Sequence, residues 1–295
     1  MIAVMGATGH TGGRIAELLL EGGQRVRALG RSLDKLSKLE SAGAEVLAGQ
    51  ADDATFLARA FRGADAAYTL LPPDVQASDS RARQDQQGEA IVKALRESRV
   101  PHVVFLSSVG ADQASGTGPI AGLRAQEERL RGLAGANVLL LRPGAFFENF
   151  HQVLGLIKHQ GINGDSVAPD VALPMIATRD IAVAAAKALQ ARDWNGVVVR
   201  ELLGPRDLTH AEATRILGER IGKPDLKYVQ LPYADMARAL MQMGISESFA
   251  GLYVEMTRAF NEGRVKSREG RGPGNTTPTR FEDFAAELAR AYQAI

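Results

Sequence analysis

The chain has 295 residues, of which 45% are hydrophobic and 23% charged, and these ordinary globular values exclude a largely disordered chain. Its 35 Lys plus Arg stand against 34 Asp plus Glu, so the net charge gives no reason to expect nucleic acid or an anionic membrane as a partner. The absence of cysteine excludes disulfides, thiolate nucleophiles and zinc–thiolate sites. The five histidines lack metal-ligand spacing, and we expect no metal site.

Apolar runs in the sequence are short. The opening run Ile2–Met5 ends at a glycine, whereas a signal peptide needs a longer apolar stretch after a basic start. No run approaches the roughly 20 apolar residues of a membrane span. We therefore expect a cytoplasmic protein without a membrane partner.

Short apolar runs alternate with helical periodicity over residues 1–150. Such alternation of strands and helices predicts right-handed crossovers and a Rossmann-type, doubly wound parallel sheet, an α/β fold. The predicted strands are Ile2–Met5, Arg25–Leu29, Glu45–Leu47, Ala66–Leu70, His102–Leu106 and Asn137–Leu141. The helices predicted between them are Thr11–Glu21, Asp53–Phe61, Glu89–Leu95 and Leu123–Leu133.

Residues 151–295 predict a smaller, mainly helical C-terminal lobe, whose strands can join the main sheet. Its predicted helices are Thr178–Ala191 with Thr178 as N-cap, Leu208–Gly222, Ala234–Met243, Phe249–Asn261 and one starting near Phe281, and its predicted strands are Val197–Leu203 and Leu226–Leu231. The basic segment Arg264–Arg271 and the Gly- and Pro-rich stretch Gly270–Pro278 indicate a mobile surface loop more than a nucleic-acid patch.

A glycine-rich turn follows the first predicted strand and precedes an apolar-periodic helix. Gly6, Gly9 and Gly12 supply a tight turn, a close approach of the backbone to a pyrophosphate, and close packing of helix on sheet. The helix then directs unpaired N–H groups and its positive dipole end toward the phosphates. The spacing differs from Gly-x-Gly-x-x-Gly, and the alternative is a strand-to-helix turn without a ligand.

The end of the second strand indicates which nucleotide is bound. An NAD site has Asp or Glu about 20 residues after the turn, but here the chain reads Leu29-Gly30-Arg31-Ser32. The Arg31 guanidinium can hold a 2′-phosphate with two parallel hydrogen bonds, assisted by Ser32 and Lys35. The sequence therefore predicts NADP(H), the alternative being that Arg31 is a solvated charge.

Three polar residues later in the chain are candidates for catalysis, and no catalytic residue is assigned among them. Ser107 and Ser108 end a buried strand at the edge where ligands bind in doubly wound folds, although they can equally cap local backbone. Arg124 belongs to a segment of alternating charge that is typical of a solvated helix face. A Ser hydrolase is disfavoured, since there is no Gly-x-Ser-x-Gly segment.

Aromatic residues cluster after the last predicted strand of the sheet. They can line a flat aromatic substrate by stacking, or they can form the core that joins the two parts of the chain. They are Phe146, Phe147, Phe150 and His151.

Several segments resemble the NmrA-like branch of the atypical short-chain dehydrogenase/reductase superfamily. They are Gly6–Gly12, Arg31-Ser32, Ser107-Ser108 and Leu141-Arg142-Pro143-Gly144 with Glu148-Asn149. The layout is similar to the NAD(P)H:quinone oxidoreductase and triphenylmethane reductase members. The resemblance implies that the pyrophosphate lies at Gly6, Thr8, Gly9, His10, Thr11 and Gly12. It places the 2′-phosphate at Arg31, the adenine near Asp52 and the adenosine ribose at Leu70, Leu71 and Pro72. It places the nicotinamide ribose at Ser107 and Ser108, and the nicotinamide at Pro143, Ala145 and Phe146.

One departure from that superfamily concerns its Tyr-x-x-x-Lys pair, whose tyrosine donates a proton. The corresponding region reads Pro119-Ile120-Ala121-Gly122-Leu123-Arg124, and no tyrosine lies between Tyr68 and Tyr228.

The sequence favours an NADPH-dependent oxidoreductase that passes hydride to a quinone-like or other electrophilic aromatic acceptor without this pair. The alternative is a non-catalytic NADP(H)-binding redox sensor with a regulatory protein as partner. An epimerase is disfavoured because it also uses the pair. The oligomeric state stays open.

Overall fold

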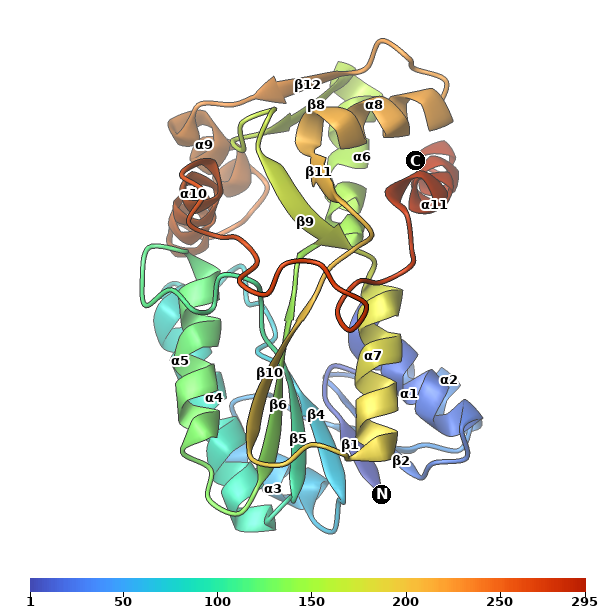
Figure 1. The fold of residues 1–295 in the computed structure, drawn as a ribbon, viewed down its shortest axis with the longest axis vertical. Coiled ribbons are helices and arrows are strands. Elements are labelled where there is room, and N and C mark those ends of the chain that lie inside the picture. Colours follow the sequence, from blue (N-terminus) through green and yellow to red (C-terminus); the bar gives the residue numbers. More distant parts are fainter.

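The computed structural model describes residues 1–295 and centres on a seven-stranded parallel sheet. The strands lie in the order β10-β6-β5-β4-β1-β2-β3, and their carboxyl ends face the C-terminal lobe (Figure 1). Their bounds are β1 Ile2–Val4, β2 Val26–Gly30, β3 Glu45–Ala48, β4 Ala66–Thr69, β5 His102–Leu106, β6 Asn137–Pro143 and β10 Val197–Leu202. This confirms the predicted Rossmann-type α/β fold.

The strands are apolar on both faces because helices cover both sides of the sheet. Along β1, Ile2 and Val4 enter one core cluster, and Ala3 enters the other. On the first face lie α1 His10–Glu21, the 3₁₀ turn η1 Asp34–Leu36, α2 Ser37–Ser41 and α7 Thr178–Ala191; on the second lie α3 Ala54–Phe61, α4 Ser80–Ser98 and α5 Pro119–Arg131.

All six strands predicted in residues 1–150 are present. The strand predicted at Val197–Leu203 is β10, which pairs with β6 although it follows residue 150 in the chain. Helix α7 likewise packs against α1. The division of the chain at residue 150 stays a prediction. Helix α4 begins at Ser80, so the predicted start at Glu89 is wrong. Residues 80–88 are largely polar and have no apolar periodicity that would predict a helix.

The smaller C-terminal lobe contains two short sheets besides its helices. These have the orders β11-β9-β7 and β12-β8. The bounds are β7 Ala145–Phe146, η2 Phe147–Val153, α6 Leu154–Gln160, β8 Ile162–Asp165, β9 Ala172–Ile176, β11 Asp207–Thr209, α8 His210–Arg220, β12 Lys227–Gln230, α9 Tyr233–Gln242, α10 Glu247–Asn261 and α11 Phe281–Gln293. The helix predicted from Leu208 is wrong at its start, because Asp207–Thr209 pairs with β9 and the Thr209 hydroxyl accepts from Glu212 N.

The N-cap predicted at Thr178 is also wrong. Thr178 is the first residue of α7, and Ala177 precedes it without a side-chain cap. The carboxylate of Glu148 accepts from Thr178 N at 3.0 Å and from its hydroxyl at 2.6 Å. Glu148 thus places a negative charge at the positive end of α7.

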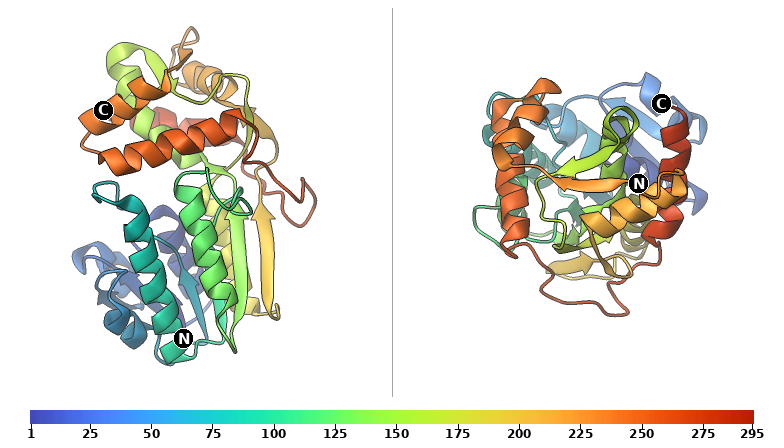
Figure 2. Two further views of the ribbon diagram at one scale, coloured as in Figure 1. Left: turned by 90° about the vertical axis from the view of Figure 1, so that its left-hand side faces the viewer. Right: turned by 90° about the horizontal axis from the view of Figure 1, so that it is seen from above.

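Residues 262–280 form a strap that runs from α10 to α11 outside β10 (Figure 2). The segment predicted as a mobile surface loop is hydrogen-bonded to the main sheet. The Glu201 carboxylate on β10 is 1% exposed and accepts from Arg268 N at 3.0 Å. Arg268 and Arg271 also pair with Asp112 and Asp207. The segment therefore makes fixed contacts with the sheet.

None of the helices combines the length and the apolar character needed to cross a bilayer.

Candidate functional site

The carboxyl edge of the sheet carries nearly every residue that the sequence singled out. Parallel strands end on the same side, so the segments after β1 to β6 come together although they are far apart in sequence. The order β6-β5-β4-β1-β2-β3 places Ser107 and Pro143 at one end of this edge, and Arg31 and Asp52 at the other. The turn Gly6–Gly12 lies between them, after β1, and the two sheet neighbours of β1 are β4 and β2.

Two glycines of this turn are required by the geometry. Gly6 has a φ of 64°, a left-handed conformation that favours glycine. A Cβ on Gly12 would lie 2.4 Å from the carbonyl oxygen of Gly6 and 2.7 Å from that of Met5. Gly12 therefore allows α1 to start directly against the end of β1. A Cβ on Gly9 would lie 3.3 Å from Gly6 O, which is tight but leaves more room.

The start of α1 presents unpartnered main-chain donors. Gly9 is the N-cap and offers no side-chain cap, and the first turn contains no acidic residue. Gly13 N donates to Gly9 O at 2.9 Å, but the N–H groups of His10, Thr11 and Gly12 donate to no group in the chain. An exposed helix start of this kind is suited to bind an anion.

Basic side chains lie beside the end of β2. Arg31 and Lys35 are exposed and Ser32 is half-buried. Lys38 pairs with Glu17 at 2.7 Å, whereas Arg31 and Lys35 form no ion pair with the chain. Their charges are therefore available to an external anion.

Asp52, after β3, is already engaged with another side chain. Its carboxylate pairs with Arg83 of α4, and Arg83 Nε also donates to Asp74 at 3.2 Å. This arrangement joins the loops after β3 and β4. Leu70, after β4, packs against the glycine turn, since its Cδ2 lies 2.8 Å from the position of a Cβ on Gly6. Leu71 is buried next to it, and Pro72 is half-buried.

A buried network occupies the ends of β5 and β6. Ser107 Oγ donates to Glu127 Oε1 at 2.5 Å, and Arg142 donates to the same carboxylate through Nε at 2.8 Å and Nη2 at 2.5 Å. Glu127 is completely buried, and Arg142 is 7% exposed. Burial opposes the charged form of Arg142, but the hydrogen bond and charge of Glu127, together with the charges of Asp112 and Glu201, raise the Arg142 pKa.

The other two catalytic candidates make only local contacts. The hydroxyl of Ser108 donates to Val109 O at 2.9 Å. Arg124 pairs with Glu128, one turn further along α5, at 3.0 Å. Pro143 ends β6 and is buried, and Phe146 is half-buried in β7.

Three tyrosines have hydroxyls that are poor acids. Burial raises the pKa of Tyr68, whose hydroxyl donates to Thr11 Oγ1 at 3.1 Å beneath the glycine turn. Burial also raises the pKa values of Tyr228 and Tyr253, both near Asp165. Helix α5 contains neither Tyr nor Lys.

The aromatic cluster belongs mainly to the core of the lobe. Phe147 and Phe150 are 1% and 5% exposed. Their ring centroids lie 5.1 and 4.9 Å from that of Phe281 on α11. His151 is exposed, with its ring edge-on to Phe284 at 6.1 Å. The interpretation of Phe147 and Phe150 as a substrate wall is therefore wrong, because their faces are covered by α11.

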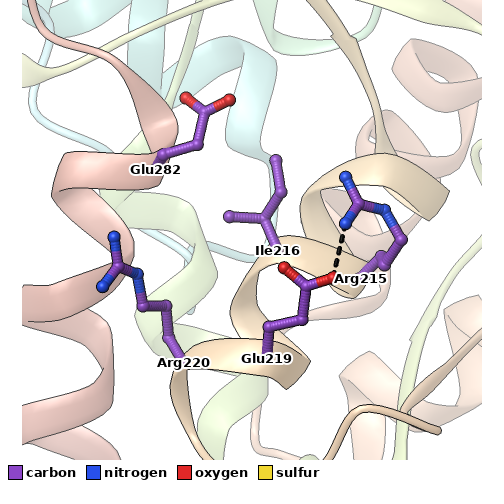
Figure 3. A pocket seen from close by; sticks show the side chains of 5 residues that line it. All are labelled: Arg215, Ile216, Glu219, Arg220 and Glu282. Carbon is purple, nitrogen blue, oxygen red and sulfur yellow. Dashed lines mark hydrogen bonds and ion pairs between the residues drawn. The ribbon is translucent and has the colours of Figure 1, made fainter.

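A pocket of about 350 Å³ lies in the lobe between α8 and α11 (Figure 3). Four of its five lining residues are charged, and Arg215 pairs with Glu219 at 2.6 Å. Balanced charges and a single apolar side chain, Ile216, do not suit a flat aromatic ligand. The pocket also lies away from the sheet edge, so we do not place the site there.

The sequence reading missed Glu127 as a site residue. Glu127 and Glu128 are adjacent in a run of alternating charges, yet Glu127 is fully buried and the Glu128 side chain is 50% exposed. No local signal separates them. The one pointer is Arg142, a charged residue inside an apolar strand, which requires a buried partner.

Comparison with known proteins agrees with this architecture. The NmrA-like family domain-containing oxidoreductase FrzB of Cladobotryum sp. is 32% identical over 162 residues, which cover 51% of this chain and 48% of that protein. The chain thus matches about half the length of that relative.

Two solved structures share the fold. The triphenylmethane reductase of Citrobacter sp., complexed with NADP(H), has a TM-score of 0.82 at 22% identity, covering 98% of this chain and 100% of the other. The NADPH-dependent quinone oxidoreductase QOR2 of Escherichia coli, complexed with NADPH, has a TM-score of 0.81 at 22% identity, covering 98% and 99%. The model of the NmrA-like family matches residues 1–285, and the chain belongs to this family.

Proposed function

We propose that the protein is an NADPH-dependent oxidoreductase that reduces a quinone-like or other electrophilic aromatic acceptor. The observation that carries the proposal is the anion-ready start of α1 next to the unpaired Arg31. Helix-start N–H groups suit a pyrophosphate, and a free guanidinium suits a 2′-phosphate. The relatives also support it, because FrzB is named an oxidoreductase and the two solved structures hold NADP(H) or NADPH.

The proposed cofactor lies along the carboxyl edge of the sheet. Gly6, Thr8, Gly9, His10, Thr11 and Gly12 hold its pyrophosphate, Arg31, Ser32 and Lys35 its 2′-phosphate, Asp52, Leu70, Leu71 and Pro72 its adenosine, and Ser107, Pro143 and Phe146 its nicotinamide half. When bound, NADPH supplies a hydride to the acceptor. The chain's contribution is to position the two reactants and to exclude water.

The acceptor class follows from the proton chemistry. The Ser107 hydroxyl donates its hydrogen bond to Glu127, and desolvation raises the pKa values of Tyr68, Tyr228 and Tyr253. Simple ketones need an acid beside the carbonyl oxygen during reduction. Quinones do not, because hydride addition gives a stabilised hydroquinone anion that can take its proton from water afterwards. A cationic dye needs no proton, because the added hydride neutralises its charge.

The test is NADPH oxidation, followed by its near-ultraviolet absorbance, against a panel of quinones, triphenylmethane dyes and simple ketones. We expect turnover of quinones or dyes and none of ketones. Turnover of ketones alone would overturn the acceptor class. Tight binding of NADPH without turnover of any acceptor would instead favour the redox sensor.

A further inference from the structure

Helix α5, which contains neither Tyr nor Lys, places a carboxylate at the ends of β5 and β6. Glu127 is the ninth of the 13 residues of α5, and its side chain contacts the ends of both β5 and β6. Its two oxygens are both used: Oε1 accepts from Ser107 and Arg142, and Oε2 accepts from Arg142. The bidentate contact fixes the plane of the carboxylate.

The hydrogen bond from Ser107 to Glu127 determines which hydrogen bond Ser107 can form with a ligand. A serine hydroxyl has one proton to donate and two lone pairs to accept with. The proton of Ser107 goes to Glu127 at 2.5 Å, and Ser107 N donates to Leu141 O at 2.7 Å. Toward a ligand, the Ser107 hydroxyl can therefore only accept a hydrogen bond.

We propose that Glu127 and Arg142 are positioning residues that hold Ser107 as an acceptor for a ribose hydroxyl of the nicotinamide half of the cofactor. The inference rests on the proposed function, which places this half at the ends of β5 and β6. Neither Glu127 nor Arg142 touches the cofactor. They act by fixing the direction of one hydroxyl.

The surroundings of Arg142 support a directing role more than a stabilising one. A buried ion pair is weak evidence for stability, because desolvation cancels most of its attraction. Arg142 lies opposite Glu201 in the register of β6 and β10, but Glu201 is committed to the strap through Arg268 N and Ser267. The Glu127 carboxylate is therefore the hydrogen-bond partner of Arg142. Glu127 has two further partners, Ser107 and Arg131, whose Nη2 lies 3.7 Å from Oε2, and of these Ser107 lies at the sheet edge.

The test is a binding cycle with two ligands, NADPH and 2′,5′-ADP, which lacks the nicotinamide half. The variants are Ser107→Ala, the double Glu127→Leu with Arg142→Met, and the triple combination. Ser107→Ala is expected to weaken NADPH by about 3- to 10-fold, as for one neutral hydrogen bond. The double variant is expected to weaken it equally, and the triple no further, because the hydroxyl is useful only when it is oriented. Binding of 2′,5′-ADP is expected to stay within about twofold in all of them.

Glu128→Leu is the matched control, since it removes the adjacent carboxylate, and it should change neither ligand. If the double variant does not fold, Glu127→Asp, which withdraws the carboxylate by one methylene, should show the same selective loss of NADPH. Three results would overturn the inference: unchanged NADPH binding in Ser107→Ala, additive losses in the triple variant, or equal losses for both ligands. Failure of the wild-type protein to bind NADPH would overturn the proposed function instead, and the cycle needs no turnover.

Discussion

The two ends of the sheet's carboxyl edge use different parts of the chain. In the half of the edge formed by β1 to β3, the available groups at the turn after β1 are main-chain N–H groups, and glycines keep side chains away from them. At the β5 and β6 end, they are side chains from two strands and a helix, linked through Glu127. The first end depends on the absence of side chains and the second on their placement. Substitutions should therefore act differently at the two ends.

Removal of the Glu127 carboxylate is expected to have the largest effect. Glu127→Ala leaves the Arg142 guanidinium buried without its partner, which costs about 3–5 kcal/mol of unfolding free energy. Replacing both residues, as Glu127→Leu with Arg142→Met, should recover most of this loss because no charge is then buried. Urea unfolding measures both. A loss no greater than that of Glu128→Ala would show that the pair is unimportant for stability.

Gly9→Val tests the main-chain end. The two added methyl groups fall beside the free N–H groups of α1, so NADPH affinity should drop by about a hundredfold or more. The fold should survive, since a Cβ on Gly9 is only in tight contact with Gly6 O. Gly12→Val is the contrasting variant, because its Cβ overlaps two carbonyl oxygens and should also lower the melting temperature. Unchanged NADPH affinity in Gly9→Val contradicts the phosphate assignment.

Arg31→Ala tests cofactor choice at the same end. Losing a charge-assisted contact of roughly 1.5–3 kcal/mol should weaken NADPH by about 10- to 100-fold and NADH little. Arg31→Asp should go further, because a carboxylate repels the 2′-phosphate and accepts from a free 2′-hydroxyl. Lys38→Ala, which removes a cation already paired with Glu17, is the control. The dissociation constants of NADPH and NADH are measured for each protein at one salt concentration. If their ratio is the same in Arg31→Ala as in the wild type, Arg31 does not contact the 2′-phosphate.

Glu148→Ala is expected to have the smallest effect. It removes the acceptor at the start of α7 and, like the loss of a cap, should cost about 1 kcal/mol of stability. NADPH affinity should not change, because Glu148 contacts Thr178 and not the sheet edge. Thermal unfolding and a nucleotide titration check the two parts. A selective loss of NADPH binding would move Glu148 into the site.

The strands and the glycine turn could be predicted because their signals are local. The apolar runs of β1, β4, β5 and β6 are largely buried on both faces, and the glycines lie between a strand and a helix. The first half of α4 has no local signal, because Ser80–Gly88 is largely polar. The predicted helix from Leu208 includes two residues of β11, because this short strand is stabilised only by its pairing with β9. Thr178 has the right residue type for a cap, but the capping carboxylate comes from Glu148, 30 residues earlier.

The sequence by itself determined the doubly wound sheet, the glycine turn, the basic end of β2 and the absence of a Tyr-x-x-x-Lys pair. Each depends on residue type and on periods of two to four residues. Only the tertiary structure decided that β10 joins the main sheet, that Phe147 and Phe150 are core, and that Glu127 is buried while Glu128 is not. The last difference depends on how α5 is rotated about its axis against β5 and β6. That rotation is set by packing with distant segments, so neighbouring residues in the sequence do not encode it.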